Sequence, residues 1–444
     1  MEVPRFRPTM ALALRKSRMW LLFLSSESQI CLRTNCHMSY ILIANSYRLS
    51  ILGFPGNPTG PQNVALLDQR LAVEWVRDNV EQFGGDPARI TLFGQSAGAA
   101  AVDFYSYAWV KDPIAAGFIP ESGNVMGWGL PNPKATTEKG WFTVSSALGC
   151  GNASSVASEV LSCMRTKSST DILNAIPTAS GTAGILGMFV PTVDDTVVFA
   201  NYTGRKAADV PMLIGNNDYE GGLWRTTFAL GGTFFPDKFW NAFNLQAFTC
   251  PTGIRANASL AQGVPTWRYR YFGTWTNLAI SSNAGTYHSA EIAMLFNTQP
   301  ANSSMAQTTF GKYIRGAWAT FAKDPKKGLT TYGEGWPTWD PTKDTLVRLA
   351  FEEKSGVNLA KGYQYDGWCS FANVSSTDAS VYAAFPDAMN PSVPPTPIAT
   401  STSGESPSGT GAAPATTTSK SSGASKLGMG VWTMMAVVLV GLML

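Results

Sequence analysis

The sequence predicts an α/β fold, in which a central and mostly parallel sheet is flanked by helices. Two observations carry this prediction. The 444-residue chain is 45% hydrophobic and only 14% charged, so it can bury a large core. In addition, segments typical of strands and of helices alternate between residues 40 and 102, as expected when helices connect the strands of a parallel sheet.

The alternation begins with a β-rich run at residues 40–44. A helix is expected over residues 63–83, where apolar residues recur with helical spacing and charged residues lie between them: Leu67, Leu71, Val76, Val80 and Phe83. The Gly-Gly-Asp-Pro sequence at 84–87 ends that helix. Residues 90–93 are typical of a buried strand, and the alanine-rich residues 97–102 indicate the next helix.

Charge and metal-binding residues exclude two classes of protein. The net charge is only +3 and the basic residues are scattered, which is not typical of a nucleic-acid-binding surface. The chain has only two histidines, His37 and His288, and no paired C-x-x-C motif, so we expect no metal site. Nothing in the sequence implies a cofactor.

The expected strand at 90–93 and the expected helix at 97–102 are joined by Gly94-Gln95-Ser96-Ala97-Gly98, a G-x-S-x-G motif. A serine on such a sharp turn has strained backbone angles, and glycines two residues away let strand and helix pass without collision. The turn exposes the hydroxyl, and the start of the helix aims N–H groups and its positive end at a developing oxyanion. Ser96 is therefore the candidate nucleophile.

A nucleophilic serine needs a base and an acid to orient that base. His37 lies in an unpatterned amino-terminal stretch, whereas His288 follows a Ser-, Asn- and Gly-rich loop late in the chain. α/β-Hydrolases carry nucleophile, acid and base in that order, so His288 is the candidate base. Asp218 and Glu220 follow an expected strand at 211–215, and their positions alone do not separate them.

Several sequence blocks resemble the type B carboxylesterase and cholinesterase-like lipase family, which has the α/β-hydrolase fold. The resemblance covers about residues 40–375. The blocks are Asn45-Ser46-Tyr47-Arg48-Leu49 with Gly53-Phe54, Leu67-Asp68-Gln69-Arg70, Trp75-Val76-Arg77-Asp78-Asn79, residues 83–87, residues 91–98, the acid loop 215–221, the histidine loop 288–292 and a late helix at 318–322.

The resemblance implies a serine carboxylic ester hydrolase acting on a small-molecule or lipid ester through an acyl-enzyme. In the family's acid loop the glutamate directly before glycine belongs to the triad, so Glu220 is favoured over Asp218. The backbone N–H of Ala97 would donate to the oxyanion. Two disulfides are implied, Cys150–Cys163 and Cys250–Cys369; the short polar stretch between the first two cysteines also indicates a closed loop.

The chain departs from the family at its amino end. A glycine-rich loop upstream of residues 47–49 supplies further oxyanion donors in the family, but here the first glycine is Gly53. Residues 1–39 resemble nothing in the family, so we expect the N-terminal strands to be missing and residues 1–39 to come from a misassembled exon. Losing donors leaves two alternatives to the hydrolase: an inactive fragment, or a non-catalytic cholinesterase-like adhesion protein.

The two ends of the chain bear on its location. Lys and Arg at residues 15–18 precede a short apolar core at 19–24, a weak secretory signal peptide. We expect an α/β-hydrolase domain over 40–389 and a Ser/Thr/Pro-rich disordered stalk over 390–426. The apolar tail 427–444 follows small residues and matches a glycolipid (GPI) anchor signal; a tail-anchored transmembrane helix is the rival.

Extracellular display on the cell surface agrees with five Asn-x-Ser/Thr sequons, at Asn152, Asn201, Asn257, Asn302 and Asn373. Substrate choice has a weaker signal. Aromatic residues after the acid loop would either line an acyl pocket or belong to the core, and the core is the commoner role of such residues: Trp224, Phe234, Phe235, Phe239 and Trp240.

Overall fold

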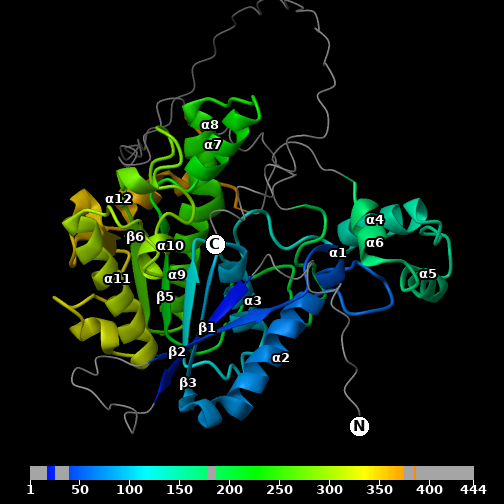
Figure 1. Ribbon diagram of the computed structural model, residues 1–444, viewed down its shortest axis with the longest axis horizontal. Helices are drawn as coiled ribbons and strands as arrows, with labels where there is room; N and C mark the ends of the chain where they lie inside the picture. Colours follow the sequence, from blue (N-terminus) through cyan, green and yellow to red (C-terminus); the bar gives the residue numbers. More distant parts are fainter. Residues whose placement is uncertain (1–17, 26–39, 178–186, 375–384, 387–444) are drawn as a thin grey trace, which may run out of the picture.

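The computed structural model describes residues 18–25, 40–177, 187–374 and 385–386. These form one eight-stranded sheet with the order β2-β1-β3-β4-β5-β6-β7-β8 (Figure 1). The strands from β3 to β7 are parallel, which confirms the predicted fold class. The strand bounds are β1 Arg18–Ser25, β2 Tyr40–Ser46, β3 Gly85–Gln95, β4 Gly117–Glu121, β5 Met212–Asn217, β6 Thr266–Tyr271, β7 Asp344–Leu349 and β8 Leu359–Lys361.

Both faces of the central strands β4, β5 and β6 are buried, as expected for parallel strands. Adjacent residues of one strand point into opposite layers: Leu92 packs with the core on one side, and Phe93 packs with the core on the other. Helices α2 (Val64–Asn79) and α3 (Ala97–Ala108) cover the first face, and α11 (Met305–Lys323) covers the second. The sheet therefore lies between two helical layers.

Strand β1 adds residues 18–25 to the amino-terminal part of the sheet, and the expectation that the family's own N-terminal strands are missing stays a prediction. It pairs antiparallel with β2 on one side and with β3 on the other, and opposes Trp20 to Phe93. The segment interpreted above as the apolar core of a signal peptide is thus a strand in the structure. A run of apolar residues suits a buried strand as well as a membrane-directed helix, and composition alone does not separate the two.

Helix α2 confirms the predicted helix but not its apolar face. Val76 and Val80 are buried as expected, whereas Leu67, Leu71 and Phe83 are exposed. The buried face instead runs through Leu66 and Val73 among others and includes the polar Gln69 and Arg70, so the apolar spacing alone does not identify it. The 3-10 helix η2 (Val80–Phe83) continues α2 to the glycine break.

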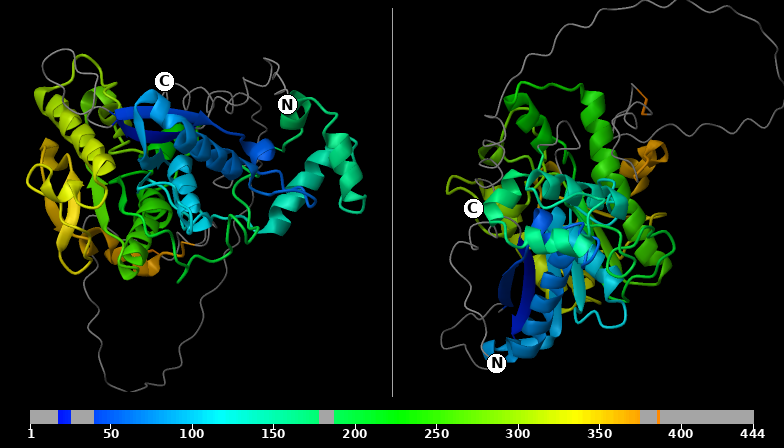
Figure 2. Two further views of the ribbon diagram at one scale, coloured as in Figure 1. Left: turned by 90° about the horizontal axis from the view of Figure 1, so that it is seen from below. Right: turned by 90° about the vertical axis from the view of Figure 1, so that its right-hand side faces the viewer.

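The remaining helices form two groups, one at an end of the molecule and one beside the last parallel strands (Figures 1 and 2). Three of them, α4 (Lys134–Ala147), α5 (Ala157–Met164) and α6 (Ser169–Asn174), gather far from α11. The others follow the last parallel strands: α7 Gly222–Leu230, α8 Asp237–Asn244, the π-helix η4 Leu245–Thr249, α9 Cys250–Ala261, α10 Ile292–Leu295 and α12 Tyr363–Asp366, with a four-residue α1 Ser50–Gly53 before α2.

Several sequence predictions fall outside the described residues: His37, the stalk over 390–426 and the anchor signal over 427–444. Within the described ranges, no helix combines the length and apolarity needed to cross a bilayer.

Candidate active site

Ser96 stands on a strained turn between β3 and α3. Its backbone has φ 60° and ψ −120°, a region that non-glycine residues rarely occupy. The flanking glycines are required by space, since a Cβ on Gly94 would lie 2.4 Å from the carbonyl carbon of Gly98. The turn is tied to the next strand by a 2.9 Å hydrogen bond from Ser96 N–H to the carbonyl oxygen of Glu121.

Helix α3 begins directly after the serine, with Ala97 exposed at its first position. The first N–H groups of a helix have no partner within the helix and carry its positive end. The backbone of Ala97 is therefore in the place expected for an oxyanion donor.

The structure brings Glu220 and His288 into contact. Oε2 of Glu220 lies 2.6 Å from Nδ1 of His288, and both side chains are buried. The backbones are joined as well, because His288 N–H donates to the carbonyl oxygen of Glu220 at 3.2 Å. A carboxylate at Nδ1 holds the proton on that nitrogen and leaves Nε2 as the basic nitrogen.

Glu220 is itself held in place by two further hydrogen bonds. Its Oε1 accepts from Asn217 N–H at 2.6 Å, and its own N–H donates to Oδ1 of Asn244 at 2.7 Å. A carboxylate with both oxygens bonded cannot rotate freely, so it fixes the plane of the imidazole.

The residue that contacts the imidazole of His288 from the nucleophile turn is Gln95, the neighbour of Ser96, and not Ser96 itself. The side-chain amide of Gln95 lies 3.2 Å from Nε2 of His288. Among the described residues, no hydrogen bond joins the Ser96 hydroxyl to the imidazole. The amide of Gln95 thus occupies the nitrogen that a general base would use, and the full triad stays a prediction.

Asp218, the carboxylate that residue positions alone could not separate from Glu220, points elsewhere. Its Oδ1 accepts from Nε of Arg270 at 2.8 Å, and its side chain is 27% exposed. Within the described part of the chain it makes no hydrogen bond or ion pair with His288.

A second buried carboxylate, which the sequence reasoning did not assign, lies behind the Glu220–His288 pair. Glu291 accepts a 2.5 Å hydrogen bond from the side-chain amide of Asn217, the residue whose backbone binds Glu220. Burial, with the charge of Glu220 adding to it, raises the pKa of Glu291 to about 8. The sequence signal that could have identified Glu291 is its position three residues after His288.

A third buried carboxylate, Glu121, ends strand β4. It accepts a hydrogen bond from the indole N–H of Trp318 at 2.5 Å, and burial raises its pKa well above the ordinary value, with the charge of Glu291 adding to the rise.

Aromatic rings line one side of the imidazole. The ring centroid of Trp224 is 4.8 Å from that of His288, and the centroid of Phe248 is 5.1 Å away. Trp128 packs against both, with centroids 4.9 Å and 5.2 Å distant. These three residues are the aromatic wall of the site.

Only Trp224 of the aromatic residues singled out in the sequence reaches His288. Trp240 is buried in the core, as its type favours, while Phe234 is 79% exposed. Phe235 and Phe239 are half-buried and stack on each other at 4.3 Å. Trp128 and Phe248 were missed because they come from other segments, before and after the acid loop.

The predicted disulfides are both present. Cys150 is bonded to Cys163 and Cys250 to Cys369, with Cα atoms 5.4 Å and 5.5 Å apart. The second joins the start of α9 to the 3-10 helix η8 (Gly367–Phe371).

All five sequon asparagines are exposed, as glycosylation requires: Asn152, Asn201, Asn257, Asn302 and Asn373. Asn257 differs from the others because it lies inside α9 and its Oδ1 accepts from the indole N–H of Trp339 at 2.8 Å. Among the described residues, no group of three or more His, Cys, Asp or Glu side chains is arranged to hold a metal ion.

Comparison with known proteins places the chain in a family. Residues 25–234 match the carboxylesterase family. Secreted lipase 5 of Gibberella zeae is 34% identical over 344 residues, which cover 71% of this chain and 63% of the lipase. Chlorogenic acid esterase of Aspergillus niger is 36% identical over 355 residues, covering 74% of this chain and 67% of the esterase.

A shorter likeness links the chain to the cholinesterase of Mus musculus, with 36% identity over 159 residues, 35% of this chain and 26% of the cholinesterase. The chain spans 63% to 67% of the length of the two fungal relatives. With its motif blocks, its mostly parallel sheet and this likeness, the chain belongs to the carboxylesterase family, whose fold is the α/β-hydrolase.

Proposed function

We propose that this chain is a carboxylic ester hydrolase that acts through Ser96, His288 and Glu220. The observation that supports it most is the 2.6 Å contact of Glu220 with His288, beside a serine on a strained turn. A buried carboxylate on Nδ1 makes Nε2 the base, and the neighbouring strained serine is the nucleophile that such a base activates.

The proposed reaction has two halves. His288 takes the hydroxyl proton as Ser96 Oγ attacks the ester carbonyl, and the alcohol leaves with that proton as the acyl-enzyme forms. Water then attacks the acyl group, gives its proton to His288, and the carboxylic acid leaves as Ser96 recovers a proton. Glu220 stabilises the imidazolium in both halves.

The amide of Gln95 must give way before this reaction can start, because it occupies Nε2 of His288 at 3.2 Å. We therefore propose that the unliganded site is in a resting arrangement, and that substrate entering beside the imidazole displaces the amide. Trading one hydrogen bond for another costs about 1 kcal/mol or less, so the change is accessible.

The oxyanion is the weak point of the proposed enzyme. Ala97 N–H supplies one donor at the start of α3, whereas the chain has no glycine before Gly53 to build the family's upstream loop. Removing one such donor typically costs about 10² to 10³ in kcat, so we propose slow turnover.

The aromatic wall of Trp128, Trp224 and Phe248 favours a substrate whose acyl part is apolar or aromatic. Flat rings beside the base bind such groups by excluding water from the contact. The names of the fungal relatives, a lipase and a chlorogenic acid esterase, fit esters of this kind.

Hydrolysis of p-nitrophenyl acetate, octanoate and cinnamate by the full chain tests the function, with Ser96→Ala as the matched control. We expect measurable hydrolysis that Ser96→Ala abolishes, and faster hydrolysis of the octanoate or cinnamate than of the acetate. Hydrolysis that survives Ser96→Ala contradicts the proposal. A folded chain that hydrolyses no ester would favour the inactive fragment or the adhesion protein. Two observations support those alternatives, the contact of Gln95 with the imidazole and the absence of a glycine before Gly53.

We further propose that the protein is extracellular and held at the plasma membrane by a lipid anchor added near residues 421–426. The exposed sequon asparagines and the family's secreted member support an extracellular location. Treating intact cells with phosphatidylinositol-specific phospholipase C tests the anchor. Release of the protein into the medium is expected, and retention after treatment points to the transmembrane alternative.

A further inference from the structure

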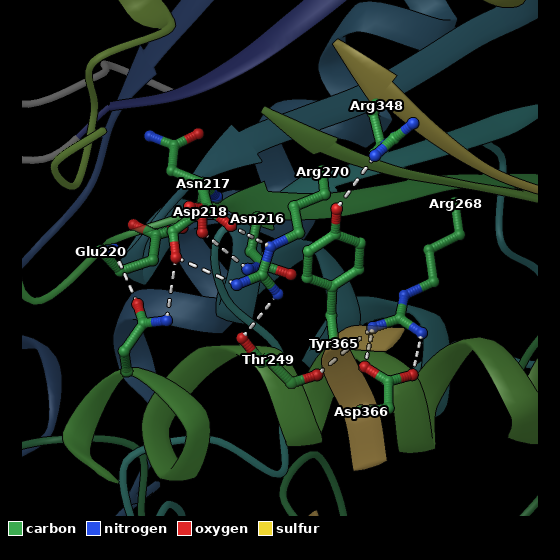
Figure 3. Close-up of polar contacts among 11 residues, drawn as sticks. Asn216, Asn217, Asp218, Glu220, Thr249, Arg268, Arg270, Arg348, Tyr365 and Asp366 are labelled. Atoms are coloured by element: carbon green, nitrogen blue, oxygen red, sulfur yellow. Dashed lines mark hydrogen bonds and ion pairs between the residues drawn. The ribbon is translucent and has the colours of Figure 1, made fainter. Parts of the chain in front are cut away.

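Arg270, a buried arginine on β6, makes hydrogen bonds to the loop that carries Glu220 (Figure 3). Nε of Arg270 donates to Oδ1 of Asp218 at 2.8 Å, and Nη2 donates to the backbone carbonyl oxygen of Asp218 at 3.0 Å. One guanidinium thus holds both the side chain and the main chain of the residue two positions before Glu220.

The arginine has its own supports on its other sides. Its Nη1 donates to the hydroxyl of Thr249 at 3.1 Å, and its guanidinium lies 4.6 Å from the ring centroid of Tyr365. The side chain is 2% exposed. The side chain of Arg270 is therefore held in place by its own contacts, and it holds Asp218 through hydrogen bonds.

The contacts of Arg270 with Asp218 lie directly after the end of strand β5. Arg270 lies opposite Asn216 in the β5–β6 register, and Asp218 N–H donates to the carbonyl oxygen of Tyr271 at 2.8 Å. Beyond Asp218 the chain leaves the sheet, so the ladder no longer determines where Glu220 lies. Asp218 makes the last main-chain hydrogen bond to the sheet before the acid, and Asn217 at the end of β5 binds the acid's carboxylate.

The acid and Asp218 also share a partner on the opposite side. The side chain of Asn244 accepts from Glu220 N–H at 2.7 Å and donates to the carbonyl oxygen of Asp218 at 3.1 Å. The carbonyl oxygen of Asp218 is thus bonded by Arg270 and Asn244 together. If the peptide bond after Asp218 rotated, its carbonyl oxygen would pull on the side chain of Asn244, which also binds the backbone N–H of Glu220.

We propose that Arg270 is a positioning residue for the acid of the triad, acting through Asp218. The inference rests on the proposed function. An arginine suits this task because its planar fork binds two oxygens in one geometry, which the single ammonium of lysine does not reproduce. It does not touch the reacting atoms, so it is not a catalytic residue.

The same strand carries a matched control. Arg268 points to the same face two residues earlier, is 1% exposed and makes two hydrogen bonds to the carboxylate of Asp366, one of them at 2.8 Å. Its guanidinium also lies over an aromatic ring, that of Trp339, at 4.8 Å. Figure 3 places this pair beside the Arg270 network, but its partner belongs to α12 and not to the acid loop.

The test compares Arg270→Lys with Arg268→Lys in the full chain. Both variants lose a two-bond contact to an aspartate, to the carboxylate of Asp366 in one case and to the carboxylate and backbone carbonyl of Asp218 in the other, so we expect similar falls in melting temperature. Only Arg270→Lys should lower kcat, by about 10- to 100-fold with KM nearly unchanged, because a misplacement of about 1 Å at the reacting groups costs this much. Asp218→Asn, which keeps the backbone contact to Arg270, should lie between Arg270→Lys and the unaltered chain.

A spectroscopic readout keeps the test independent of turnover. The Nδ1 proton shared by His288 and Glu220 should give a downfield proton resonance, assigned by its loss in His288→Gln. We expect this resonance to shift or broaden in Arg270→Lys and to stay in place in Arg268→Lys. If the unaltered chain hydrolyses no ester, the proposed function fails, while the resonance still decides the role of Arg270. Equal resonances, or equal kcat values, in the two lysine variants overturn the inference.

Discussion

Asn217 joins two carboxylates, because its backbone N–H binds Glu220 at 2.6 Å and its side-chain amide binds Glu291 at 2.5 Å. Glu291 is fully buried behind the acid, and its pKa rises from an ordinary 4.5 to about 8. At neutral pH one of the two carboxyls therefore carries a proton, and Glu291 is the one that keeps it.

Glu291→Gln should make the stability of the protein less dependent on pH. The unfolded chain releases the Glu291 proton near pH 4.5 and the folded chain near pH 8, so stability from this group is present below pH 4.5 and is lost as pH rises toward 8. The loss is at most about 5 kcal/mol, at roughly 1.4 kcal/mol per pKa unit. Urea denaturation at pH 5 and pH 8 measures it.

We expect the unaltered chain to lose more stability than Glu291→Gln between these two pH values. Glu81→Gln changes an exposed carboxylate and controls for the change in charge. An equal loss in all three proteins would show that Glu291 ionises at the same pH folded and unfolded.

Gln95→Ala should speed the reaction of Ser96 with a fluorophosphonate probe. Removing the amide frees Nε2 of His288 to accept from the serine hydroxyl. A net hydrogen-bond contribution of about 0.5 to 1.5 kcal/mol corresponds to roughly a 2- to 10-fold faster labelling. Mass spectrometry of the labelled peptide follows the rate, and Ser96→Ala gives the background. Slower labelling of Gln95→Ala would mean that the amide assists the imidazole.

Replacing the cysteines of each disulfide by serine should destabilise the protein by unequal amounts. The bonds close loops with sequence separations of 13 residues for Cys150–Cys163 and 119 residues for Cys250–Cys369. Loop-closure entropy predicts losses of about 3 and about 5 kcal/mol. Urea unfolding of the two double variants measures the difference. A larger loss at the shorter loop would show that chain entropy does not govern these bonds.

Removing one partner of the buried ion pair between Asp103 on α3 and Arg255 on α9 should destabilise the fold strongly. Nε of Arg255 lies 2.6 Å from Oδ1 of Asp103, and both side chains are almost fully buried. Arg255→Met leaves an unpaired buried carboxylate, which costs about 3 to 5 kcal/mol. Denaturant unfolding gives the value.

The double variant Asp103→Leu/Arg255→Met should recover most of that loss, because it buries no charge. Lys134→Ala, which breaks an exposed ion pair to Glu138 on α4, should cost less than about 1 kcal/mol. A double variant as unstable as Arg255→Met would show that packing, and not the unpaired charge, causes the loss.

The nucleophile turn could be predicted from sequence because its determinants are neighbours. Gly94 and Gly98 flank Ser96, and a Cβ on Gly94 would clash with the backbone of Gly98 in the same motif. The strands and helices on either side follow from short apolar runs and glycine breaks. Such local signals fix the bounds of an element, but not which face of a helix is buried, as the exposed Leu67 and Leu71 demonstrate.

The supports of the acid could not be predicted because they are distant in the chain. Arg270 is 52 residues from Asp218 and Asn244 is 24 residues from Glu220, and no pattern in either segment marks them. The contact of Gln95 with His288 spans 193 residues, although Gln95 lies inside the recognised motif. Only the register of the sheet and the packing of α8 bring these side chains together.

Strand β1 gives residues 18–25 a structural role at the edge of the nucleophile strand. β2 has β1 as its partner in the sheet, and β1 also covers the side of β3 that ends at the nucleophile turn. Among the described strands, β2 pairs only with β1, and without β1 the strand β3 would present a row of open N–H and C=O groups ready to bind another chain. In the described structure, β1 therefore keeps the edge of β3 beside Ser96 from pairing with another chain.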